Sequence, residues 1–165
     1  MSDVGLSFHF DRMVLSLALG YVLGDEGSGA DIGRTLLQDA FYQRMPDHVR
    51  RSLFGDDGPD LSATVEEVYR SAFPAKALAS RTAHLAGLLH EPYVRDLISA
   101  RFNALLDILT TFFGVEQRAE VYATGSVAHG FSELLSDVLL DRGMSLIAAE
   151  PDPLPGLVRY HERPV

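Results

Sequence analysis

Two short stretches of the chain carry glycines, carboxylates and hydroxyls that could bind a ligand. The first is a turn with glycines at 24, 27 and 29 and with Asp25 and Glu26 between them, reached from an apolar, strand-like segment. Glycine permits positive φ and a close approach of the backbone to a bound molecule. The two carboxylates stand where the first N–H groups of a following helix need acceptors. The turn is interpreted either as a binding turn for a polar ligand or as a flexible helix N-cap.

The second stretch is Thr124-Gly125-Ser126-Val127, between an expected strand and an expected helix. Ligands of open α/β sheets gather at the carboxyl ends of strands. Gly125 permits close approach, and the Ser126 hydroxyl with the N–H groups of the helix start suits a phosphate, a ribose or another polar group. A plain strand-to-helix turn capped by Ser126 fits the spacing equally well. Neither a Walker A lysine nor a G-x-G-x-x-G fingerprint occurs.

Other familiar chemistries have no pattern to support them. The six histidines form no H-x-x-x-H pair and no zinc spacing, and the serines lack a G-x-S-x-G elbow. The carboxylate pair Asp25 and Glu26 could do acid–base work, but adjacent side chains need not face one site. The chain has no cysteine. Disulfides, thiolate chemistry, cysteine-held zinc and an Fe–S cluster from this chain are therefore excluded.

The bulk properties predict one domain in a soluble, cytoplasmic protein. The 165 residues, 47% of them hydrophobic, can form one sizeable core. A net charge of −9 and a pI near 5.0 argue against a nucleic-acid or an anionic-membrane surface, because no cluster of Lys and Arg is present. No signal peptide opens the sequence, and no apolar run approaches the ~20 residues of a spanning helix.

The elements expected before residue 90 position the first stretch. Residues 6–10 and 13–19 are predicted to form a hairpin that leads into the glycine turn. Apolar residues at helical spacing predict a helix over 30–44, ended by Pro46. Shorter helices are expected over 48–53, 62–71 (capped by Thr64 or Ser62) and 74–89, with a loop over 55–60.

The elements expected after residue 90 position the second stretch. A broad apolar face predicts a long packing helix over 92–113, closed by Gly114. Buried strands over 120–124 and 145–149 flank a helix that begins at 126, ends near Asp141 and is stopped by Gly143. This βαβ order predicts two parallel strands with a right-handed crossover. A short helix over 155–161 closes the chain.

Both stretches together resemble the C-terminal lobe of the N-acetylglucosamine kinase-like family, within the superfamily of sugar kinases, actin and heat-shock chaperones. The matching segments keep their order and spacing over nearly all of residues 19–161. They are Leu19-Gly-Tyr-Val-Leu-Gly-Asp-Glu-Gly-Ser-Gly-Ala-Asp-Ile-Gly33, Val68-Tyr-Arg-Ser-Ala-Phe-Pro74, Ala77-Leu-Ala-Ser80, Pro92-Tyr-Val-Arg95, Thr124-Gly-Ser-Val-Ala128 and Gly156-Leu-Val-Arg-Tyr-His161.

The resemblance implies a fold and a set of roles. The fold would be an α/β lobe of the actin-like ATPase (ribonuclease H-like) type, with a small mixed sheet and a large helical insertion over about residues 30–115. Asp25 would hydrogen-bond hydroxyls of the amino sugar, with Gly29 and the backbone from Ala18 to Gly20 beside it. Ala79 and Ser80 would border the adenine, and Gly125 and Ser126 would form the adenosine motif. The complete family member would use ATP and Mg²⁺.

The chain also departs from the family. The N-terminal lobe, with its Asp-Gly-Gly phosphate loop and catalytic aspartate, is absent from residues 1–165, and Val4-Gly-Leu-Ser7 is at best a remnant of a Gly-Thr-Gly-Ser loop. A branch that activates benzoyl-CoA reductases through a cysteine-held cluster is disfavoured. Since phosphoryl transfer needs charge neutralisation between two lobes, the chain alone is expected to lack kinase activity. The alternative is a non-catalytic binding or assembly module that pairs with itself or with a separate N-lobe.

Overall fold

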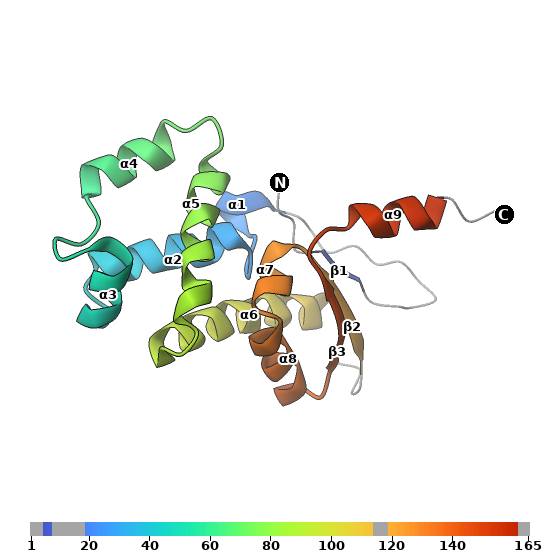
Figure 1. Ribbon diagram of the computed structural model, residues 1–165. Coiled ribbons are helices and arrows are strands. Elements are labelled where there is room, and N and C mark those ends of the chain that lie inside the picture. Colours follow the sequence, from blue (N-terminus) through green and yellow to red (C-terminus); the bar gives the residue numbers. More distant parts are fainter. Residues whose placement is uncertain (1–4, 8–18, 114–118, 162–165) are drawn as a thin grey trace.

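The computed structural model describes residues 5–7, 19–113 and 119–161, and these form an α/β structure that is mostly helical (Figure 1). Three strands make one sheet in the order β1 (Gly5–Ser7), β2 (Glu120–Thr124) and β3 (Ser145–Glu150). β1 is antiparallel to β2, and β2 is parallel to β3. The predicted βαβ unit is confirmed. Gly5–Ser7, part of the segment regarded as at best a remnant of a phosphate loop, forms β1.

β2 and β3 are not the fully buried strands that the sequence predicted. Along β2, Val121 and Ala123 are buried, whereas Glu120 and Tyr122 are exposed. On β3, Ile147 lies at a register shift opposite Val121 and Tyr122 and is also exposed. Helices therefore cover only one face of this parallel pair among the described residues.

The chain before the glycine turn is helical rather than strand-like. α1 (Gly20–Leu23) is a single turn of helix, and Leu19 belongs to no strand. The remainder of the predicted hairpin, residues 8–18, lies outside the described residues. α2 (Gly29–Phe41) and α3 (Asp47–Phe54) agree with the two helices expected next.

The middle of the chain holds α4 (Leu61–Tyr69) and α5 (Pro74–Thr82), followed by a 3-10 helix, η1 (Ala83–Leu88). The cap predicted for α4 is wrong: neither Ser62 nor Thr64 precedes the helix. The Asp60 carboxylate instead accepts a hydrogen bond from the Ala63 N–H at 2.7 Å. This is the stronger N-cap geometry, because the acceptor lies one residue before the helix.

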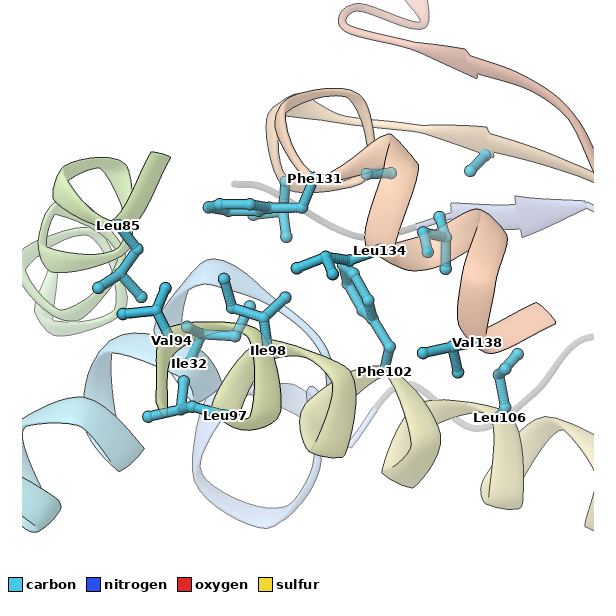
Figure 2. Packing of buried hydrophobic residues seen from close by; sticks show 14 of the residues in the cluster. Ile32, Leu85, Val94, Leu97, Ile98, Phe102, Leu106, Phe131, Leu134 and Val138 are labelled. Atoms are coloured by element: carbon cyan, nitrogen blue, oxygen red, sulfur yellow. The ribbon is translucent and has the colours of Figure 1, made fainter. Parts of the chain in front are cut away.

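α6 (Pro92–Phe113) coincides with the long helix predicted. Its apolar side chains pack into the main hydrophobic core (Figure 2). Its buried side chains include Val94, Ile98, Phe102 and Leu106. Figure 2 shows them facing Ile32 of α2 on one side and Leu134 and Val138 of α8 on the other. The apolar face of α6 therefore packs against α2, which belongs to the helical insertion, and against α8, which lies on the sheet.

Two helices replace the single one predicted between the parallel strands: α7 (Ser126–Gly130) and α8 (Ser132–Asp141), separated at the buried Phe131. Gly143, at φ 74°, ends α8 as predicted. Its N–H donates to the Leu140 carbonyl at 2.9 Å and that of Met144 to Leu139 at 2.9 Å, the paired bonds of a Schellman motif.

α9 (Leu154–His161) follows β3 and projects away from the other elements (Figure 1). Across the described ranges, no helix is long and apolar enough to cross a membrane.

Candidate functional site

The glycine turn, residues 24–28, folds into a tight structure on top of α6. Asp25 has φ 74° and Gly27 has φ 76°. A Cβ at Gly27 would lie 3.2 Å from Cβ of Leu105, so the turn rests directly on α6. Left-handed φ is uncommon for a residue other than glycine and is best tolerated by Asn and Asp. The half-buried Asp25 is thus held in a constrained conformation at the site expected to contact a sugar.

The carboxylates predicted to cap α2 do not do so. Ser28 is the N-cap, and its Oγ accepts a hydrogen bond from the Asp31 N–H at 3.1 Å. In return, Oδ2 of Asp31 accepts one from the Gly27 N–H at 3.0 Å. Ser28 and Asp31 thus form a variant of the capping box.

Asp31 is the centre of a charged network beneath the turn. Its side chain is 2% exposed. Arg34 donates to Oδ1 at 2.8 Å, and Nε of Arg101, on α6, donates to Oδ2 at 2.7 Å. Arg34 also donates to the Tyr21 carbonyl at 2.8 Å, which ties α1 into the network. A buried carboxylate that accepts several hydrogen bonds has little freedom to move. The bond from the Gly27 N–H to Asp31 therefore holds the glycine turn in place.

The first ligand stretch meets the second at Gly29. A Cβ on this residue would lie 3.1 Å from Cβ of Ala79 and 3.4 Å from Cγ2 of Val127. A larger residue at this position would require its neighbours on α5 and α7 to move by a few tenths of an ångström. Thr82 holds the contact by donating from Oγ1 to the Gly29 carbonyl at 2.7 Å. The residues expected at the sugar and at the nucleotide therefore belong to one junction.

The turn between β2 and α7 depends on a glycine with positive φ. Gly125 has φ 117°, and its N–H donates to the Glu150 carbonyl at 2.8 Å, which fixes the turn to the end of β3. The alternative in which Ser126 caps the helix is wrong: Gly125 is the N-cap, and Ser126 makes no capping hydrogen bond. The side chain of Ser126 is exposed.

The remaining predicted contacts lie around this junction. Ser80 is exposed on α5, with its Oγ donating to the Ala77 carbonyl at 2.8 Å, and Ala79 is half-buried against Gly29. Gly20, at φ 73°, is exposed, and its carbonyl accepts from the Gly24 N–H at 2.9 Å. Gly20 is therefore hydrogen-bonded to the first residue of the glycine turn. Ala18 lies outside the described residues.

Two cavities flank the junction. One of about 290 Å³ opens where β2 and β3 end, and Thr124, Glu150, Asp152 and Leu157 are among its lining residues. The other, of about 600 Å³, is an apolar groove between α1, α2, α4 and α5, with Tyr21, Arg34, Phe41, Val65 and Leu78 among its lining. Neither is lined by Asp25, Gly29 or Ser126. The walls of both cavities are therefore formed by residues other than these three predicted ligand residues.

The four residues expected at the nucleotide are uncharged. Gly125, Ser126, Ala79 and Ser80 offer close backbone approach and hydroxyls. Two carboxylates, Glu150 and Asp152, line the cavity at the strand ends and would repel phosphate. Within the described ranges, no group of three His, Asp or Glu side chains could hold a metal ion.

Sequence reasoning missed the network of Asp31, Arg34 and Arg101. The serine and aspartate at the S-x-x-D spacing of Ser28 and Asp31 were a usable signal for the N-cap. No local pattern joins Asp31 to Arg101, because 70 residues separate them.

Comparisons with known proteins support the reading of the chain as an α/β lobe of a sugar kinase. No protein-family model and no curated protein matches it. It is similar to a crystal structure from Porphyromonas gingivalis named "Putative N-acetylglucosamine Kinase", with a TM-score of 0.76 and 33% identity over 87% of this chain. The chain spans about half the length of that protein, since the match covers 50% of it.

The resemblance predicted from the sequence is therefore confirmed. The chain resembles the C-terminal lobe of an N-acetylglucosamine kinase-like protein.

Proposed function

We propose that this chain is the sugar- and nucleotide-contacting C-terminal lobe of an ATP-dependent amino-sugar kinase, with an actin-like, ribonuclease H-like fold. The observation that carries the proposal is the 33% identity to the Porphyromonas gingivalis protein over 87% of the chain. At that identity and a TM-score of 0.76, more than a general α/β architecture is shared.

The junction at Gly29 supports the assignment of roles. Asp25 orients the hydroxyls of the amino sugar, because a carboxylate accepts hydrogen bonds from neighbouring hydroxyls in a directional way. Gly20 and Gly29 line the sugar with backbone, while Ala79, Ser80, Gly125 and Ser126 contact the nucleoside. The contact of Gly29 with Ala79 and Val127 makes these two groups of residues neighbours.

Phosphoryl transfer itself requires the other half of the kinase. Positioning and neutralisation of charge on the transferred phosphoryl group provide most of the catalysis. The described residues offer carboxylates rather than cations at the strand ends. ATP and Mg²⁺ are therefore cofactors of the two-lobed enzyme, which acts in the cytoplasm, and this chain alone is inactive.

The second candidate is a non-catalytic binding or assembly module that pairs with itself or with a separate N-lobe. The exposure of Leu154, Leu157 and Val158 on α9 favours it, because monomers seldom expose several apolar side chains together.

A coupled kinase assay with N-acetylglucosamine and ATP, together with calorimetric titration of each ligand, tests the first candidate. We expect no turnover by the chain alone and measurable binding of the sugar. Turnover would contradict the assignment of phosphoryl transfer to the other half, and binding of neither ligand would favour the assembly module.

A further inference from the structure

We propose that the apolar groove of about 600 Å³ between α1, α2, α4 and α5 is a binding site for an apolar monocarboxylate. Such a ligand has a hydrocarbon body, which the groove encloses, and one acid group, which Arg34 binds. None of the residues assigned above to the sugar or the nucleotide lines this groove. The site is therefore additional to the proposed kinase function and does not depend on it.

The groove has the size and the lining of a small-molecule site. Its volume falls within the roughly 300–1,000 Å³ of typical ligand pockets. The buried Leu37 and Leu78 belong to a hydrophobic cluster that is separate from the main core, and Tyr21 and Phe41 pack against the same cluster. All four line the groove. They offer aliphatic and aromatic surface to a hydrocarbon body, whose transfer from water is favourable.

α4 forms a wall of the groove with an apolar face that is still exposed. Leu61, Val65 and Val68 follow the i, i+4, i+7 spacing of one helical face, and all three line the groove. No residue of α4 is buried, and Leu61 and Val65 are 61% and 45% exposed. A helix this short is marginal unless its apolar face is packed. A hydrocarbon body in the groove would supply that packing at the edge of the molecule where α4 lies (Figure 1).

Arg34 determines the charge of the ligand. Of the described residues that line the groove, it is the only charged one, and its side chain is 34% exposed. Nη1 donates to the Tyr21 carbonyl and Nη2 to Asp31. Because a guanidinium has five N–H groups, donors remain for a ligand.

The ion pairs around Arg34 favour a monoanion. Asp31 pairs with both Arg34 and Arg101. Two guanidinium groups therefore share one carboxylate, which leaves an excess of one positive charge in this network. A carboxylate carries one negative charge and matches the planar donors of a guanidinium.

Calorimetric titration of the full 165-residue chain with octanoate, octanol, acetate and naphthoate tests the chemistry of the ligand. Octanoate and octanol share a hydrocarbon body and differ in charge. We expect octanoate to bind at least tenfold more tightly than octanol and acetate to bind immeasurably weakly. Added salt should weaken the binding of octanoate and leave that of octanol unchanged. The proposal is overturned if neither octanoate nor naphthoate binds, or if octanol binds as tightly as octanoate.

Two matched substitutions locate the site. Val65→Asp places a carboxylate in the wall of the groove, where it repels the ligand, and should weaken octanoate binding at least tenfold without lowering the unfolding temperature. Val158→Asp adds the same charge to an exposed valine on α9, at the other end of the structure, and should leave binding unchanged (Figure 1). Normal binding by the α4 variant, or an equal loss in both variants, would overturn the proposal.

Arg34→Gln should abolish the preference for octanoate over octanol, because it removes the positive charge and leaves the apolar walls in place. A preference that persists in this variant would contradict the role of Arg34. The Val65 and Val158 variants leave Arg34 intact, so they decide the location of the site even if Arg34→Gln does not fold.

Light scattering distinguishes the small ligand from a second copy of this chain, which is the other occupant suited to an apolar groove. We expect Val65→Asp to leave the oligomeric state unchanged. A dimer that dissociates in this variant would assign the groove to the second copy and overturn the proposal. None of these measurements contains sugar or ATP, so failure of this site and failure of the proposed kinase role are separate results.

Discussion

Arg101 reaches from the middle of α6 to the buried carboxylate of Asp31 and donates to it at 2.7 Å. Asp31 is 2% exposed and stands one turn into α2, directly below the glycine turn. The long core helix therefore sets the position of the turn that we assign to the sugar. Stability and ligand binding at this turn depend on the same contact.

Removing the carboxylate of Asp31 should destabilise the fold. Asp31→Ala leaves Arg34 and Arg101 without their acceptor and the Gly27 N–H without its partner. Breaking a buried ion pair in this way costs about 3 kcal/mol, the lower end for such pairs because both arginines are partly exposed. Urea unfolding measures the loss. Glu66→Ala, which removes an exposed i, i+4 pair with Arg70, should change stability by less than about 0.5 kcal/mol.

Gly33 marks the closest approach of α2 and α5. A Cβ there would lie 2.0 Å from the carbonyl oxygen of Leu78, which is backbone and cannot rotate away. Gly33→Ala should therefore separate the two helices and cost about 3 kcal/mol or more. The control is Gly87→Ala, because a Cβ at Gly87 meets nothing within 4 Å. Equal unfolding temperatures for the two variants would contradict the close approach of α2 and α5 at Gly33.

Tyr93 should make the fold sensitive to alkaline pH. Burial raises the pKa of its hydroxyl, and the hydrogen bond to Asp39 at 2.9 Å raises it further. Above pH of about 10 the unfolded chain releases this proton while the folded chain keeps it, so the free energy of unfolding falls as pH rises through that value. Below about pH 10 the contribution is fully present.

Tyr93→Phe provides the measurement. At pH 7 it should lower stability by about 1 kcal/mol through loss of the hydrogen bond. Denaturant titrations from pH 8 to pH 11 should show that this deficit shrinks as pH rises. A deficit that stays constant would contradict a raised pKa for Tyr93.

The sequence predicted those parts of the fold that local patterns determine. The bounds of α6 followed from its continuous apolar face, and the parallel pairing of β2 with β3 followed from the strand–helix–strand order. The break at Phe131 and the change to a 3-10 helix at Ala83 were not predicted, because tertiary packing decides them and the local apolar spacing does not.

The sequence named the residues of the candidate site but did not predict the contacts that bring them together. The contact of Gly29 with Ala79 and Val127 joins residues that the sequence placed in two separate stretches. The alternative in which Asp25 and Glu26 cap the helix is not realised, because Ser28 lies one residue before the helix and is its N-cap. Their roles, and those of Ser80, Gly125 and Ser126, stay predictions.

Calorimetric titration of N-acetylglucosamine into the unmodified chain, Asp25→Asn and Glu26→Gln tests the central claim most directly. Asparagine tolerates the left-handed φ of Asp25, so this substitution removes the charge without straining the backbone, whereas alanine would add about 1 kcal/mol of strain. Glu26→Gln removes the same charge from the neighbouring residue. We predict that Asp25→Asn weakens sugar binding at least tenfold and that Glu26→Gln leaves it unchanged; equal binding by all three proteins would contradict the assignment of Asp25 to the sugar.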